Sequence, residues 1–283
     1  MTTLTGSCRA SLNYAAGAGL HKAGLVEVEV EIRDGRSAHL PGWRECGFEL
    51  VSHTSAVTDW TNDTELAAVH YPEVEAVARN LTGCDFALVS DHVKRTAEEA
   101  KREREQSPVR LVHSDFAANY ADIVRSGYRG VRGRGAATLA RSGLRADDVE
   151  KARRIVMLQF WRNLGPAKMD QPVAFCDART VTPAETRPFR YTGYVAGGRS
   201  FDALAVVAPD GPGNHAWYVF PEMTPDEVVA FRTYDTELVG DGKTYFTPHS
   251  AFRDPEVELG KPPRFSIELR VMCLFTSELP TRP

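Results

Sequence analysis

The chain is poor in cysteine, and its cysteines form no recognisable group. It has five of them in 283 residues, an odd number without a Cys-x-x-Cys pair. Disulfide frameworks and thiolate zinc sites both need regular cysteine spacing. The sequence therefore predicts neither of these, but buried, reduced thiols. The cysteines are Cys8, Cys46, Cys84, Cys176 and Cys273.

Long apolar runs are missing as well. No stretch approaches the roughly 18 apolar residues that a membrane-spanning helix needs, and residues 1–19 lack the basic start and continuous apolar segment of a secretory signal. We therefore expect a cytoplasmic protein without a membrane partner, whose core forms by burial alone, since 42% of its residues are hydrophobic. A homodimer is compatible with the sequence.

An excess of positive charge is also absent. The formal net charge of −4 argues against a nucleic-acid partner for the whole chain. One segment is an exception, because residues 125–154 carry nine basic side chains with glycines among them. This basic segment is either a mobile lid that recruits an anionic substrate or a solvated loop followed by a helix. Its basic residues are Arg125, Arg129, Arg132, Arg134, Arg141, Arg145, Lys151, Arg153 and Arg154.

The hydrophobic pattern indicates one domain, residues 1–283, in two parts. Residues 1–107 alternate at period two over 26–32 and show helical spacing over 63–81, which predicts an N-terminal α/β elaboration. Residues 108–283 are short apolar runs divided by proline and glycine, which is typical of an antiparallel barrel or sandwich. We expect a helix near 145–154. Strands are expected near 109–116, 153–161, 172–176, 201–208, 216–220, 228–234, 244–249 and 264–275.

Eight such strands suit a jelly roll. The predicted fold is therefore mainly β with some α: a double-stranded β-helix of the cupin-like type, with the N-terminal helices packed on it.

His113 and Asp115 form the most informative motif. Residues i and i+2 of a strand point to the same side, so both side chains can reach one metal ion. His249 offers a third ligand later in the chain, although His215 is a rival. Two histidines and one carboxylate form the facial triad of non-haem Fe(II) oxygenases.

An arginine follows the last of these histidines, at the start of the final strand. In 2-oxoglutarate oxygenases an arginine in this place pairs with the distal carboxylate of the cosubstrate. Arg264 and Arg270 are both candidates, because positions 264, 266, 268 and 270 share one face of a strand. Trp161, Arg162, Trp217 and Tyr218 are candidates for the substrate pocket, with a structural role in the core as the alternative for each aromatic residue.

Several segments together resemble one known family, from about residue 65 to 275. They are similar to the family of the cephamycin 7-methoxylation oxygenase (CmcJ-like) and the fungal hydroxylase/desaturases of the AsaB type. The segments that carry the resemblance are Tyr71-Pro72-Glu73, Val112-His113-Ser114-Asp115, Phe160-Trp161-Arg162, Trp217-Tyr218-Val219-Phe220-Pro221 and Pro248-His249-Ser250-Ala251-Phe252.

The resemblance implies Fe(II) ligands at His113, Asp115 and His249. It also implies 2-oxoglutarate binding by Arg264 with Ser266, in an Arg-x-Ser pair. Gln159 stands where the family has Asn, and Phe265 stands where it has an acidic residue.

Three functions remain open from the sequence. The first is an Fe(II)- and 2-oxoglutarate-dependent hydroxylase or desaturase, with O2 as cosubstrate, acting on a small secondary metabolite or an amino-acid-derived substrate. The second is a cupin-like metal-dependent isomerase or lyase that does not use 2-oxoglutarate. The third is a noncatalytic sandwich that binds a small molecule, since the fold alone does not decide function.

Overall fold

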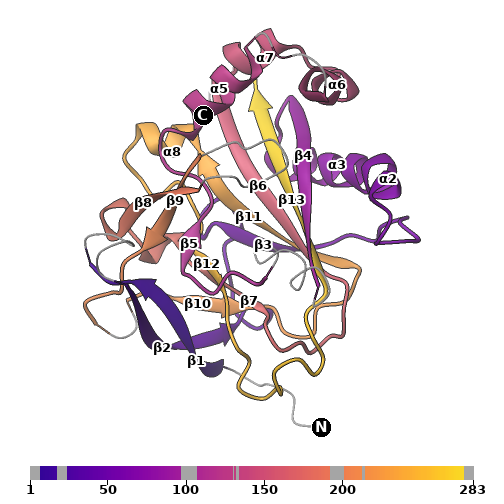
Figure 1. Ribbon diagram of the computed structural model, residues 1–283. Helices are drawn as coiled ribbons and strands as arrows, with labels where there is room; N and C mark the ends of the chain where they lie inside the picture. Colours follow the sequence, from indigo (N-terminus) through magenta and orange to yellow (C-terminus); the bar gives the residue numbers. More distant parts are fainter. Residues whose placement is uncertain are drawn as a thin grey trace.

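Two β-sheets face each other in the molecule, as Figure 1 shows. The computed structural model describes residues 7–17, 24–96, 107–129, 131, 134–191, 201–211 and 214–276. Strands of the N-terminal part lie in both sheets beside strands of the C-terminal part. The predicted division of the chain at residue 108 stays a prediction.

The larger sheet has eight strands in the order β1-β2-β10-β7-β12-β5-β9-β8. Its neighbours pair antiparallel apart from β2 and β10, which are parallel. The strands are β1 (Ser7–Ala15), β2 (Leu25–Asp34), β5 (His113–Ser114), β7 (Val173–Cys176), β8 (Thr186–Tyr191), β9 (Phe201–Val206), β10 (Trp217–Val219) and β12 (His249–Ala251).

The smaller sheet has five longer strands in the order β3-β11-β6-β13-β4, all antiparallel. Its three central strands are buried along almost their whole length, so both faces of this sheet are covered. The strands are β3 (Phe48–Ser52), β4 (Phe86–Arg95), β6 (Arg154–Asn163), β11 (Glu227–Asp235) and β13 (Ser266–Phe275).

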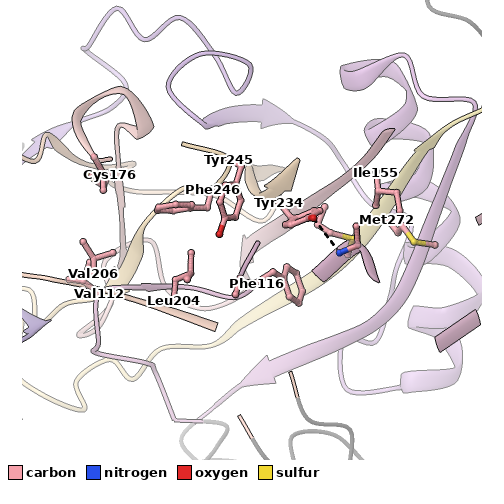
Figure 2. Packing of buried hydrophobic residues seen from close by; sticks show 14 of the residues in the cluster. Val112, Phe116, Ile155, Cys176, Leu204, Val206, Tyr234, Tyr245, Phe246 and Met272 are labelled. Carbon is pink, nitrogen blue, oxygen red and sulfur yellow. Dashed lines mark hydrogen bonds between the residues drawn. The ribbon is translucent and has the colours of Figure 1, made fainter. Parts of the chain in front are cut away.

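The main core lies between the two sheets. Figure 2 shows Leu204 and Val206 of the larger sheet in the same cluster as Ile155, Tyr234 and Met272 of the smaller one. Side chains alternate along a strand, so the neighbours of Met272 on β13, Val271 and Cys273, belong to a second cluster on the outer face.

Helices cover the outer face of the smaller sheet and one end of the molecule. The predicted helix over 63–81 is confirmed as α2 (Asp63–Glu65), η1 (Leu66–His70) and α3 (Tyr71–Thr82), whose apolar side packs on the second cluster. Asn62 caps the start of α2, accepting from two backbone N–H groups. The other helices are α5 (Tyr120–Tyr128), α6 (Arg134–Arg141), α7 (Ala146–Lys151), α8 (Thr236–Gly240), η3 (Ala178–Thr180) and η4 (Pro183–Glu185).

Six of the eight strands predicted after residue 108 agree closely with the structure, and two do not. Of the segment 109–116 only His113–Ser114 is strand, and of 244–249 only the last residue is. β8 was not predicted, because Pro188 and two arginines hide its pattern. The five cysteines are free, and four of them are buried as predicted, whereas Cys8 is only partly buried.

The basic segment, residues 125–154, is not one loop. Where the structure describes it, it contains the end of α5, all of α6 and α7, and the first residue of β6. Arg132 lies outside the described residues, as do the charged residues 97–106 and His21. Among the described residues, no helix is long and apolar enough to cross a membrane.

Candidate metal centre

His113, Asp115 and His249 meet between the two sheets. β5 and β12 are antiparallel neighbours in which His249 pairs directly with His113, and Asp115 follows β5 at once. The two imidazole centroids are 4.3 Å apart. One ligand atom from each of the three side chains lies within 4.8 Å of the other two. Within the described parts of the chain, these are the three side chains that fit a metal ion.

Backbone carbonyls set the orientation of both imidazole rings. His113 Nδ1 lies 2.7 Å from the Leu111 oxygen, and His249 Nδ1 lies 3.1 Å from the Thr247 oxygen. A carbonyl can only accept, so each Nδ1 carries a proton, and Nε2 is the ring nitrogen of each histidine that is left to bind a metal. The Nε2 atoms lie 3.4 Å and 4.0 Å from Asp115 Oδ1. Two nitrogen donors and one carboxylate oxygen therefore converge, a donor set that suits Fe(II).

The charges in this group also suit a metal. Burial, together with the neighbouring His113, lowers the pKa of His249 to about 3, so its ring is neutral at pH 7. Burial opposes ionisation of Asp115, but the charge of nearby Arg270 is the main cause that outweighs it and lowers the pKa of this carboxyl well below its usual value. Asp115 is therefore a carboxylate at neutral pH.

The two candidate arginines have different surroundings. Arg264 lines the pocket of the triad, donates from Nε to Ser266 Oγ at 2.8 Å, and has its guanidinium 5.2 Å from the Trp161 ring. Burial and nearby Arg95 lower the pKa of Arg264 to about 9, so it is still a cation at pH 7. Arg270 instead lies against Asp115, with two nitrogens at 3.2 Å and 3.3 Å from Oδ2.

Trp161 and Arg162 lie on opposite faces of β6. Trp161 lines the pocket of the triad. The fully buried Arg162 instead donates to the carbonyl oxygens of His53 and Pro225 on the outer face. The expectation that Arg162 faces the substrate pocket is therefore corrected, because adjacent strand residues cannot point the same way.

The other aromatic candidates and the rival histidine belong to the core. Trp217 donates from Nε1 to the Tyr14 hydroxyl at 2.8 Å, and Tyr218 packs on Phe48. His215 contacts Tyr14 and Glu185, not the triad. None of these three side chains lines the pocket of the triad. A structural role, the alternative to substrate binding for Trp217 and Tyr218, therefore fits the contacts of both residues.

Some residues of the pocket had no clear signal in the sequence. Arg95 and Phe231 line it, from β4 and β11, and the Phe231 ring lies 4.8 Å from that of His249. Glu268 lines it too, as the shared face of positions 264 to 270 allowed. The pairing of Arg95 with Ser266 across β4 and β13 explains its place, but a register between distant strands cannot be read from one sequence.

A second, mostly apolar pocket adjoins the pocket of the triad. Trp161 and Val173 line both pockets, so these two side chains form the partition between them. The apolar pocket has Lys168, Glu222 and Asp254 among its few charged residues. Its apolar wall includes Met169, Pro172, Phe175, Val219, Phe220, Met223 and Phe252.

Two facing sheets with a two-histidine, one-carboxylate group between them define the class of jelly-roll non-haem oxygenases. A family model described as oxidoreductase/YMDC permease-like domain matches residues 7–274, and the chain belongs to this family. Its curated relatives include fungal hydroxylase/desaturases, which confirms the resemblance found in the sequence.

The relatives and a solved structure agree with this membership. Hydroxylase/desaturase CTB9 of Cercospora beticola is 28% identical over 251 residues, 82% of this chain and 71% of that protein. The alpha-ketoglutarate-dependent dioxygenase phiK of a fungal species is 28% identical over 240 residues, 82% of this chain and 78% of that protein. The iron and alpha-ketoglutarate-dependent endoperoxidase NvfI matches with a TM-score of 0.74 at 19% identity, over 98% of this chain and 100% of that chain. This match confirms the predicted jelly-roll fold.

Proposed function

We propose that this chain is an Fe(II)- and 2-oxoglutarate-dependent hydroxylase or desaturase of secondary metabolism. One observation carries the proposal: three ligand atoms within 4.8 Å of one another share a pocket with Arg264, a buried cation. The names of the relatives phiK and NvfI, which include alpha-ketoglutarate dependence, support it.

The side chains of the site have different roles in this proposal. His113 and His249, through Nε2, and Asp115, through Oδ1, would hold the iron. With Fe(II) and 2-oxoglutarate bound, the site supplies oxidation of a C–H bond by O2, coupled to conversion of 2-oxoglutarate to succinate and CO2. Trp161 and Phe231, as large apolar walls, keep water from the reacting atoms.

Arg264 binds the distal carboxylate of 2-oxoglutarate in this proposal. Its contacts with Ser266 Oγ and the Gln171 carbonyl fix the guanidinium in place, which lowers the entropy lost on binding an anion. The cavity among the triad, Arg264 and Glu268 measures about 20 Å³, enough for one ion or water. The surrounding side chains therefore move when the cosubstrate binds.

The apolar pocket beyond Trp161 and Val173 supports a small-molecule substrate with an apolar carbon skeleton. Such a substrate is more typical of a secondary metabolite than of an amino acid, whose charged groups would need buried partners. Lys168, Glu222 and Asp254 are the charged residues that line this pocket, whereas at least seven of its lining residues are apolar.

The alternatives from the sequence are less well supported. A cupin-like isomerase or lyase has no need of a buried arginine beside its metal, yet Arg264 is buried there at the cost of desolvation. A noncatalytic binding protein has no need of two Nε2 atoms held ready for a metal.

The test uses anaerobically purified protein loaded with Fe(II), then given 2-oxoglutarate and O2. We expect succinate above a metal-free control even without substrate, and loss of that signal in His249→Ala. Metal binding without succinate, with a broad panel of apolar and amino-acid substrates, would favour the isomerase or lyase. Wild-type protein that retains no metal would favour the noncatalytic reading.

A further inference from the structure

The two carboxylate oxygens of Asp115 have different partners. Oδ1 lies towards the two imidazoles, 3.4 Å from His113 Nε2 and 4.0 Å from His249 Nε2. Oδ2 accepts from the Gln159 side-chain amide and from two nitrogens of Arg270. One oxygen therefore faces the metal ligands, and the other is occupied by three N–H donors.

Both donors come from the sheet opposite Asp115. Gln159 on β6 and Arg270 on β13 are direct neighbours in the antiparallel register, and each is buried. Asp115 follows β5 in the larger sheet. The contact therefore crosses the space between the sheets and ties the carboxylate to the smaller sheet.

The surroundings of Gln159 indicate that this side chain does not serve the stability of the fold. The Gln159 Oε1 atom is buried and has no hydrogen-bond partner. The side-chain hydrogen bond that the structure shows for Gln159 is the one from its amide nitrogen to Asp115. A buried unpaired amide oxygen costs about 1–3 kcal/mol, and an apolar side chain of similar size avoids that cost. The amide nitrogen must face Asp115, because an amide oxygen would meet the carboxylate oxygen with no proton between them.

We propose that Gln159 and Arg270 are positioning residues that make Asp115 a one-oxygen ligand of the metal. The proposal rests on the metal site of the proposed function. A carboxylate with two open oxygens can take two positions on a metal, whereas Asp115 with Oδ2 occupied can take one. Binding through one oxygen of Asp115 would leave room at the metal for the cosubstrate and O2. Arg270 acts through Asp115 and does not bind 2-oxoglutarate, which is left to Arg264.

Gln159→Leu is the first test, because it removes the amide without changing any charge. The measurement is a titration of metal-free protein with Co(II) alone, followed by visible absorption, whose bands report the number and kind of ligands. We expect Co(II) affinity 10- to 100-fold below wild type, the usual effect of losing a group that orients a ligand, together with a changed spectrum. Unchanged affinity and an unchanged spectrum would overturn the role of Gln159. If Gln159→Leu does not fold, Gln159→Asn, one methylene shorter, is judged by the same outcomes.

Arg270→Gln and Arg264→Gln form a matched pair, since both arginines are buried, Arg270 on β13 and Arg264 just before it. Without 2-oxoglutarate, we expect Arg270→Gln to change the Co(II) spectrum and Arg264→Gln to leave it as in wild type. Arg264→Gln should instead raise the 2-oxoglutarate concentration needed for half-maximal succinate formation by 10- to 100-fold. The reverse assignment of these two effects would overturn the role of Arg270. If Arg270→Gln is unfolded, Arg270→Lys, which keeps the charge but loses the two-nitrogen contact, is measured instead.

These outcomes separate the proposal from the function on which it rests. Wild-type protein that binds Co(II) but forms no succinate would contradict the proposed activity, while the comparison of variants would still decide the role of Gln159. Wild-type protein that binds no Co(II) would overturn both.

Discussion

At the scale of single residues, the site depends on which face of a strand each side chain occupies. Gln159 and Trp161 lie on the inner face of β6 and reach the metal centre, whereas Arg162 lies on the outer face. Arg162 is held there by the carbonyl oxygens of His53 and Pro225, and its nitrogen Nη2 contacts His53 Nδ1. This arginine joins two loops to the sheet, and we assign it to stability.

Arg162→Leu should destabilise the fold without changing the Michaelis constant for 2-oxoglutarate. The carbonyls of His53 and Pro225 lose their donor in partly buried contacts, and the expected cost is about 2–4 kcal/mol. The measurement is urea unfolding, with the Michaelis constant for 2-oxoglutarate measured on the folded enzyme.

Arg129→Leu is the control for Arg162→Leu. The Arg129 side chain is 68% exposed, so its loss should change stability by less than about 0.5 kcal/mol. A raised Michaelis constant with normal stability in Arg162→Leu would show that this arginine acts at the pocket after all.

At the scale of elements, the short strand β12 is held in place by a turn from the N-terminal part of the chain. Thr247, two residues before His249, donates from Oγ1 to the Gly47 carbonyl, and its own carbonyl accepts from the His249 ring. Gly47 has φ of +96°, and a Cβ there would meet Thr247 Oγ1 in close contact. The turn and the metal ligand are therefore coupled through one threonine.

Gly47→Ala should weaken both the fold and metal binding. The positive φ and the clash together should cost about 1–3 kcal/mol, and the displaced Thr247 carbonyl should lower Co(II) affinity. Gly143→Ala is the matched control, because Gly143 also has a positive φ of +70° but open space around it. Equal loss of Co(II) affinity in the two variants would disprove the coupling.

At the scale of the whole molecule, folding buries imidazoles that must stay neutral. Burial lowers the pKa of His70 to about 4 despite its contact with Glu73, and the pKa of His249 to about 3. His70 is the buried last residue of η1, among the outer helices, and His249 lies between the sheets, so both parts of the fold share this property. The unfolded chain takes up a proton at each histidine near pH 6.5.

The stability of the metal-free protein should therefore fall as the pH drops from about 6.5 to about 4. In that range the unfolded state binds more protons than the folded state, so the free energy of unfolding declines by about 1.4 kcal/mol per pH unit for each of the two histidines. His70→Gln should remove one such contribution in urea unfolding measured across this range. His39→Gln, at an exposed position, should not. A pH slope that is the same in His70→Gln and wild type would contradict this account.

The sequence alone predicted the triad of two histidines and one carboxylate and the type of fold. The i, i+2 spacing of His113 and Asp115 allows both side chains to face one side of the chain, although only His113 lies in β5. A histidine before a late arginine completes the set, so their meeting could be predicted. Period-two alternation predicted β2, and short apolar runs divided by proline and glycine predicted most strands after residue 108. The helix over 63–81 was predicted from the helical spacing of its apolar residues.

Only the tertiary structure decided how these parts face one another. Arg264 and Arg270 were predicted to share a face of one strand, and nothing local in the sequence distinguishes them, whereas in the structure Arg264 lies just before β13 and Arg270 lies on it. Arg270 meets Asp115 and Arg264 meets the pocket because β13 lies opposite β5 at one particular register. The short β5 and β12 were misjudged for a related reason, since two and three residues carry too little periodicity to set a boundary. Contacts between distant strands depend on the packing of two sheets, and a single sequence does not encode that packing in any local pattern.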